Sequence, residues 1–152
     1  MAIEVKELAQ LKLMRKAGLV VADTLKLIEN SAQIGMTTLD LNEIAIKNLA
    51  KHGATSSFLG YHGFPAVICA SVNEEVVHGI PNKRQLVSGD ILSIDFGAIV
   101  DGWHGDAAIS FGLGEIEAAD QKLMDVCRQS MWQGIAAGKK GAKLTDISAA
   151  IE

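Results

Sequence analysis

The sequence has few of the features that mark secreted, membrane or linker-rich proteins. Its 152 residues include only two cysteines and two prolines. Cys69 and Cys127 are too few for a disulfide framework, which favours the reducing cytoplasm. Two prolines leave no proline-rich linker, while 15 glycines predict many tight turns. The apolar runs, such as 17–22 and 65–72, are far shorter than the ~20 residues of a membrane span.

An excess of basic charge is also missing. The chain carries 14 Lys and Arg against 18 Asp and Glu, a net charge of −4, which argues against a nucleic-acid partner. The first residues include Glu4, Lys6 and Glu7 in place of the apolar region of a signal peptide. With 49% hydrophobic and 21% charged residues, the composition indicates one globular domain with a real core.

The first third of the chain is predicted to be helical. Apolar residues recur at alternating steps of three and four from Leu11 to Ile28, which indicates a helix with one apolar stripe. Thr37 followed by Asp40 is a capping-box pattern, so a second helix is expected to begin at Thr37 and end at Gly53.

The middle of the chain, rich in glycine and β-branched residues, predicts strands. The dipeptide Asp101-Gly102 is a strong two-residue hairpin signal between two apolar runs. We expect a polar loop over 81–90 and strands over 66–72, 76–78, 91–100 and 103–111.

The last part returns to helix from about Ala118, breaks at Gly141 and begins a new helix near Leu144. Helix, glycine break and helix start also describe the first helical region. We therefore interpret 1–152 as a single catalytic-type domain that is incomplete at its C-terminus, with 1–117 as a first α/β unit and 118–152 as the start of a second. Chance likeness between two amphipathic helix pairs is the alternative.

Asp95 and Asp106 are the sharpest chemical feature. If Asp101 and Gly102 are the loop residues, Gly97 faces Asp106, so the two carboxylates are diagonal neighbours on one sheet face, about 7–8 Å apart at the backbone. Their apolar neighbours predict a buried strand pair, where facing carboxylates repel unless a proton or cation lies between them. A pair of divalent metals resolves that conflict. Alternatively, one aspartate caps a turn and the other faces solvent. Asp101 is different, because it belongs to the turn and is expected to have only a structural role there.

The histidines are ambiguous from local sequence alone. His78 ends a predicted strand and precedes Gly79, which can present its imidazole to a pocket as a proton donor or a substrate contact. His62 and His104 have similar glycine-rich surroundings, and a lone histidine is more often a structural hydrogen bonder. His52, beside Gly53, is expected to be only helix-terminal.

Three motifs together carry a family resemblance. They are Gly-Tyr-His-Gly-Phe-Pro at 60–65, Asn-Glu-Glu-Val-Val-His-Gly-Ile-Pro at 73–81, and the two hairpin aspartates in Ser-Ile-Asp-Phe-Gly at 93–97 and Asp-Gly-Trp-His-Gly-Asp at 101–106. In this order and spacing the whole chain resembles the bacterial type I methionine aminopeptidases. The resemblance implies an α/β (α+β) pita-bread fold, in which two pseudo-symmetric halves surround a dinuclear metal site.

The resemblance also implies a function and a set of site residues. The family removes the initiator methionine from nascent proteins, which would be met at the ribosome. Two divalent ions, of cobalt, manganese, iron or zinc, are implied as cofactors. The residues that match are Asp95 and Asp106 as metal ligands, His78 as the catalytic substrate-contacting histidine, Tyr61, Phe64 and Cys69 in the methionine pocket, and His62 on the substrate side. Phe64 is an apolar variant where some members have tyrosine.

One departure from the family is large. Its members are longer, and a histidine ligand, two glutamate ligands and a further catalytic histidine lie in their second half. The resemblance therefore implies a fragment, a truncated product or a gene product that needs another piece. We expect this chain alone to be inactive and to pair with a missing C-terminal half or with itself, without nucleic-acid or membrane partners. A non-catalytic pita-bread binding module and an X-Pro metallopeptidase are the alternatives.

Overall fold

The computed structural model describes residues 4–152. The chain forms two compact units, the first ending at Glu115 and the second beginning at Ile116. The first unit contains helices α1 (Leu8–Ser31) and α2 (Thr38–His52) and a four-stranded antiparallel sheet. The second contains helices α3 (Ala118–Ala137) and α4 (Leu144–Ile151). None of the helices within residues 4–152 has the length and apolar character needed to cross a membrane.

Both predicted helices of the first unit are present. The buried stripe of α1 includes Val21, Leu25 and Ile28, whereas Leu11, at the start of the predicted stripe, is 47% exposed. The capping box at the start of α2 is confirmed, because the Thr37 side chain accepts a hydrogen bond from the backbone N–H of Asp40. Helix α2 ends before Gly53, which has the left-handed conformation that favours glycine there.

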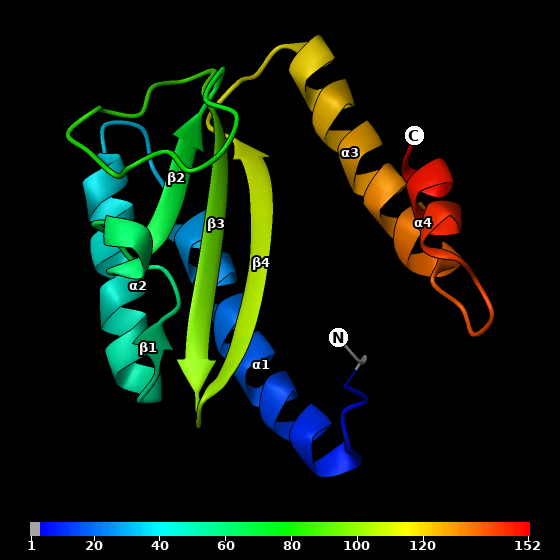
Figure 1. Cartoon of the computed structure of the whole chain (residues 1–152). Coiled ribbons are helices and arrows are strands. Elements are labelled where there is room, and N and C mark those ends of the chain that lie inside the picture. The colour runs from blue at the N-terminus through cyan, green and yellow to red at the C-terminus, as the bar shows by residue number, and fades with distance from the viewer. Residues whose placement is uncertain (1–3) are drawn as a thin grey trace. The chain divides into compact units, whose positions relative to one another are not determined.

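The sheet is organised around its longest inner strand. Strand β3 (Ile91–Val100) pairs along its whole length with β4 (Trp103–Gly112), and the two are joined by the predicted turn. Different parts of β3 also pair with β1 (Thr55–Ser56) and β2 (Ile68–Val72). Figure 1 shows β2, β3 and β4 side by side, with β3 in the middle.

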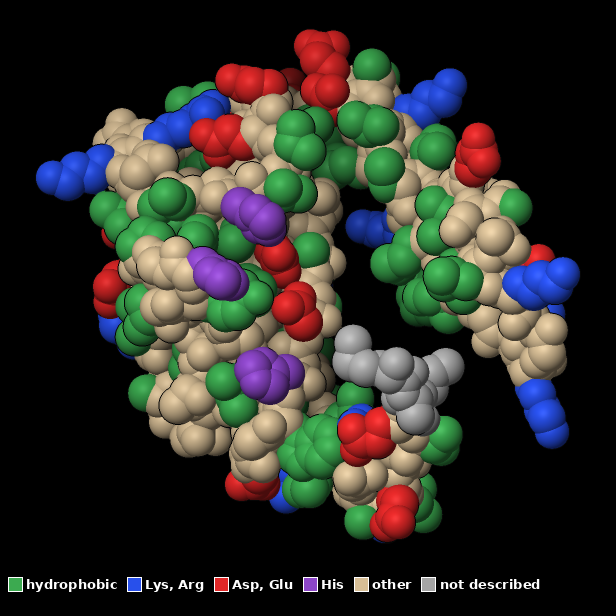
Figure 2. Space-filling model, viewed as in Figure 1, with side chains coloured by type: hydrophobic (Ala, Val, Ile, Leu, Met, Phe, Trp, Pro, Cys, Tyr) green, Lys and Arg blue, Asp and Glu red, His purple; other side chains and the backbone are tan. Residues whose placement is uncertain are grey.

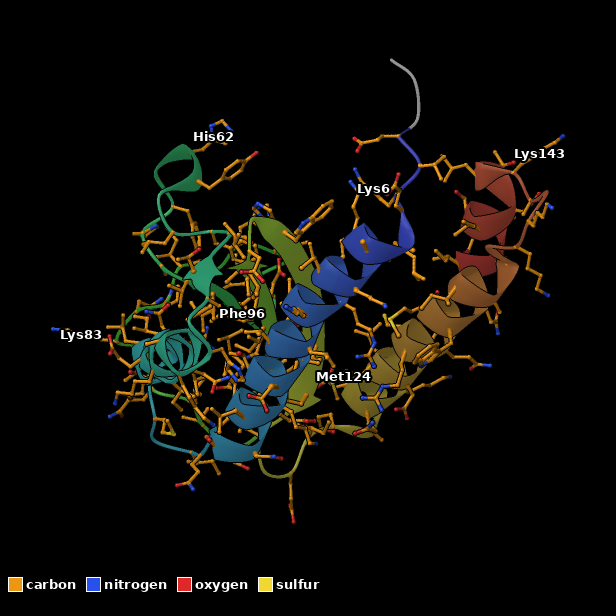
Figure 3. The ribbon with its side chains drawn as sticks, turned by 90° about the horizontal axis from the view of Figure 1, so that it is seen from below. Lys6, His62, Lys83, Phe96, Met124 and Lys143 are labelled. Carbon is orange, nitrogen blue, oxygen red and sulfur yellow. The ribbon has the colours of Figure 1, made fainter. Side chains whose placement is uncertain are left out.

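The helices cover one face of this sheet and leave the other for the site. Helix α1 packs against β3 and β4, and α2 contacts β1 and β2 (Figure 1). The side chains of β3 that enter this core alternate along the strand and are fully buried: Leu92, Ile94, Phe96 and Ala98. Figure 3 shows Phe96 in the interior of the unit. The intervening residues of β3 therefore project from the opposite face.

Two expectations were wrong. The strand expected over 76–78 is an irregular segment. His78 has a φ of 59°, which is incompatible with a strand, and hydrogen bonds of Gly79 with Ser71 and Ala70 of β2 hold the segment in place of strand pairing. The hairpin is buried only on the helix-covered side. Asp106 is exposed because it projects from the open face, whereas Ile109 and Phe111 lie on the helix-covered face and are only half-buried because β4 is an edge strand.

The helix pairs of the two units begin their second helices in the same way. A glycine with a φ of 90°, Gly35 in one unit and Gly141 in the other, precedes each helix N-cap by two residues. The N-cap backbone N–H then donates to an aspartate three residues later, at 2.7 Å to Asp40 and 2.8 Å to Asp146. The similarity noted in the sequence therefore extends to backbone conformation and capping.

Candidate active site

One pocket in the first unit is lined by every residue that the sequence singled out for chemistry. It encloses about 850 Å³ on the sheet face opposite the helices. Figure 2 shows histidine and acidic side chains close together on this face. The predicted residues among its lining are Tyr61, His62, Phe64, Cys69, His78, Asp95 and Asp106.

The two carboxylates are held by the hairpin register. Asp106 pairs with Gly97 and Asp95 with Ala108, as the turn predicted, so both project from the pocket face. Burial raises the pKa of Asp95, and the negative charge and hydrogen bonding of Asp106 raise it further, while His78 opposes the shift. The pair therefore favours a shared proton or a cation between its oxygens.

The donor set fits a divalent cation in kind but supplies few ligands. Carboxylate oxygens suit hard and borderline divalent ions. Across the described residues 4–152, however, no group of three or more His, Cys, Asp and Glu side chains lies close enough to hold a metal ion. Asp95 and Asp106 thus offer two protein ligands, and water or another polypeptide must supply the rest.

Cys69 lies on β2 directly across from Asp95. Burial, followed by the charges of Asp95 and Asp106, raises the pKa of the Cys69 thiol to about 11. The thiol is therefore protonated at neutral pH, and thiolate chemistry is suppressed. In this state Cys69 acts as a small apolar part of the pocket wall.

Aromatic side chains form much of the remaining wall. Tyr61 and His62 lie on a short 3-10 turn, Tyr61–Gly63, with ring centroids 4.4 Å apart. Figure 3 shows this turn, with its labelled His62, on the outside of the unit. Phe64 meets Phe58 edge to face at 6.5 Å. The combination gives a slot for an apolar ligand side chain.

Sequence reasoning missed Ser57, Phe58 and Ile80 as pocket residues. The available signal was Gly97, a glycine inside a strand, which often marks a close approach. A Cβ on Gly97 would lie 2.8 Å from the Phe58 ring and from the Ser57 Cβ, so the glycine admits this segment onto the sheet. Ser57 in turn is hydrogen bonded to His104 at 3.0 Å, and both line the pocket.

His78 and His52 have different settings. His78 lines the pocket from the irregular segment after β2 and influences the carboxyl group of Asp95. His52, the expected helix-terminal residue, is in the last turn of α2 and hydrogen bonds to Asp23 at 2.9 Å. Only His78 of these two belongs to the pocket.

Comparison with known proteins places this arrangement in context. The model of a family described as metallopeptidase family M24 matches residues 12–152. Methionine aminopeptidase 1 of Mycobacterium tuberculosis is 51% identical over 144 residues, which cover 94% of this chain and 54% of the relative. Methionine aminopeptidase of Clostridium acetobutylicum is 46% identical, with 99% of this chain and 60% of the relative covered. The chain thus spans little more than half the length of these relatives.

Solved structures agree with the expected pita-bread fold. The crystal structure of methionine aminopeptidase from Rickettsia prowazekii has a TM-score of 0.95 at 37% identity, covering 99% of this chain and 60% of that chain. The prolidase from Pyrococcus furiosus has a TM-score of 0.84 at 12% identity, covering 97% of this chain and 42% of that one. The prolidase likeness shows a shared fold only.

Proposed function

We propose, because the chain belongs to metallopeptidase family M24, that its pocket binds the N-terminal methionine of a peptide and forms part of a site that removes the initiator methionine from new proteins. The carrying observation is that an aromatic slot and paired carboxylates line one pocket. The names of the similar proteins from M. tuberculosis and C. acetobutylicum point to the same substrate.

Each group has a separate task in this proposal. Tyr61, Phe64 and Cys69 contact the unbranched methionine side chain, whose flexible thioether suits a slot lined by aromatic rings. In the metal-free chain, Asp95 and Asp106 provide the negative charge that selects a free, positively charged amino terminus. His78 contacts the peptide next to the bond that is cleaved and stabilises developing charge by hydrogen bonding. His62 lies on the substrate side.

Asp95 and Asp106 are also the proposed ligands of two divalent ions, with cobalt, manganese, iron and zinc as candidates. When bound, such ions supply an activated water and positive charge at the reacting carbonyl. Two carboxylates leave most coordination positions unfilled by protein, so we expect weak ion binding and little or no turnover by these 152 residues alone.

The substrate assignment is tested by nuclear magnetic resonance titration of the chain with small ligands. Methionine amide is expected to shift the signals of Tyr61, Phe64 and Cys69, while N-acetyl-methionine amide, which lacks the positive charge, binds more weakly. Alanyl-proline, the ligand for an X-Pro site, should shift few of these signals.

Two substitutions sharpen this test. Asp95→Asn should weaken methionine amide binding. Asp101→Asn should not, because Asp101 lies in the turn outside the pocket lining, where its carboxylate oxygen is 3.6 Å from the Lys16 Nζ. Equal binding of charged and acetylated ligands, or a preference for alanyl-proline, would overturn the assignment.

The proposed partners follow from the open side of the sheet. We propose that residues 116–152 begin a second α/β unit and that a further polypeptide half, or a second copy of this chain, covers the exposed face of β4. The substrates would be nascent chains met at the ribosome in the cytoplasm, where free thiols such as Cys69 and Cys127 persist. Sedimentation of the mass-verified chain tests self-association, and a cooperative monomer would contradict it.

A further inference from the structure

His78 has a left-handed backbone conformation. Its φ of 59° lies in a region that is uncommon for residues other than glycine, although histidine adopts it more often than most. Such a conformation persists only where surrounding interactions hold it. The structural question is which contacts fix the segment from Asn73 to Asn82, in which His78 lies.

Both ends of this segment are anchored far from His78. At the start, the Asn73 side chain accepts from the backbone N–H of Ile91 at 2.8 Å and donates to Asp90 at 2.9 Å. At the end, the backbone N–H of Asn82 donates to the Thr38 hydroxyl at 2.8 Å. These anchors fix where the segment leaves and rejoins the fold, and leave its middle to other contacts.

The middle is held at Gly79, the residue after His78. The backbone N–H of Gly79 donates to the Ser71 hydroxyl at 3.1 Å, and the Gly79 carbonyl accepts from the N–H of Ala70 at 2.9 Å. A Cβ on Gly79 would lie 2.9 Å from the Cα of Ser71, so only glycine fits this close against β2. Ser71 itself is 4% exposed.

We propose that Ser71 is a positioning residue that holds His78 in its pocket-facing conformation through Gly79. Of the two hydrogen bonds at Gly79, only the one to Ser71 depends on a side chain. Ser71 does not line the pocket, so it acts on a ligand only through His78. The functional part of this inference rests on the proposed role of His78, whereas the conformational part stands on geometry alone.

Ser71→Ala tests the conformational part on the ligand-free chain. The amide of Gly79 is expected to exchange about tenfold faster, as for the loss of a hydrogen bond of ordinary net strength. The carbon chemical shifts of His78 should also move away from left-handed values. Gly79→Ala removes the same anchorage from the other side and should produce the same shift at His78.

Ser93→Ala is the matched control. Ser93 lies directly across from Ser71 on the same sheet face, but its hydroxyl hydrogen bonds to Ser110 at 2.7 Å. This variant should leave Gly79 and His78 unchanged. Unchanged signals at both residues in Ser71→Ala, or faster exchange spread evenly over β3 and β4, would overturn the proposal, because the first shows no anchorage and the second a merely structural role.

A double-mutant comparison tests the link to function. Ser71→Ala should weaken methionine amide binding in the original chain and have no further effect in a His78→Ala chain, because its influence passes through that histidine. Equal weakening in both backgrounds would overturn the proposal. Absence of methionine amide binding in the original chain would instead overturn the proposed function and the functional link, while the changes at Gly79 and His78 would still decide the anchorage.

Discussion

Asp106 on β4 lies directly across from Gly97 on β3. Because Gly97 has no side chain, the residue paired with Asp106 does not cover the Asp106 carboxylate on the pocket face. Asp95 is the diagonal neighbour of Asp106 on this face, and its pKa is raised in part by the charge of Asp106. The charge of Asp106 therefore raises the pKa of two other pocket residues, Asp95 and Cys69.

Replacing Asp106 with asparagine should lower the pKa of Cys69 from its value of about 11, because one of the two charges that oppose thiolate formation is removed. The thiolate should then form at lower pH in an ultraviolet titration of a Cys127→Ser chain, which contains Cys69 as its single thiol. Asp101→Asn is the control and should leave the titration unchanged. An identical Cys69 titration in the Asp106→Asn chain would contradict the described proximity.

Manganese should bind weakly to this chain and more weakly still after Asp106→Ala, since one of the two proposed carboxylate ligands is lost. Asp101→Ala should have no such effect, because Asp101 belongs to the turn. Isothermal calorimetry measures both. Tight binding of two ions to the unsubstituted chain would show that two carboxylates are not the limiting donors. Equal losses in the two variants would mean that the hairpin register does not set the site.

Two neighbouring glycines should respond to alanine with opposite signs. Gly18 is a helical residue with open space around it, so Gly18→Ala should stabilise the fold by roughly 0.5–1 kcal/mol. A Cβ on Gly105 would lie 2.6 Å from the backbone of Ala17, so Gly105→Ala should cost roughly 1–3 kcal/mol by forcing α1 away from β4. Urea unfolding measures both free energies, and a neutral Gly105→Ala would contradict this close packing.

Acid should weaken the contact between α1 and α2. Hydrogen bonds from Asn48 and His52 lower the pKa of Asp23 below its ordinary 3.8. The stabilisation from Asp23 is therefore complete above the unfolded value and is lost as the pH falls through the lower folded value. Asp23→Asn should reduce the acid dependence of the unfolding free energy, whereas Glu43→Gln, which removes a charge from exposed α2 surface, should not. Identical pH profiles for the Asp23→Asn and original chains would contradict this linkage.

Local pattern was sufficient for the features set by short-range geometry. The Asp101-Gly102 turn fixed the pairing of Asp106 with Gly97, and the spacing of Thr37 and Asp40 located the start of α2. The conformation at 76–78 was not predictable in this way. It depends on side chains distant in sequence, such as Asp90, which accepts a hydrogen bond from the Asn73 side chain. It also depends on the close approach of Gly79 to β2.

The pocket lining shows the same limit. Tyr61, Cys69 and His78 were identified through family resemblance, but Ser57 and Phe58 enter the pocket only because β1 pairs with the far end of β3. That pairing joins segments about 40 residues apart and has no local signature. The exposure of Asp106 was missed because apolar neighbours on one face of an edge strand do not reveal whether its other face is covered.

The alternation along β3 has a consequence for how this gene tolerates change. Phe96 fills the core while its neighbours Asp95 and Gly97 lie on the opposite face, Asp95 in the pocket and Gly97 beneath Ser57 and Phe58, so successive codons are subject to different requirements. In a saturation library, positions such as 94 and 96 should accept apolar residues of similar volume. Position 95 should instead be restricted by charge, and position 97 by the absence of a side chain. Drift along this strand would then be constrained with a period of two.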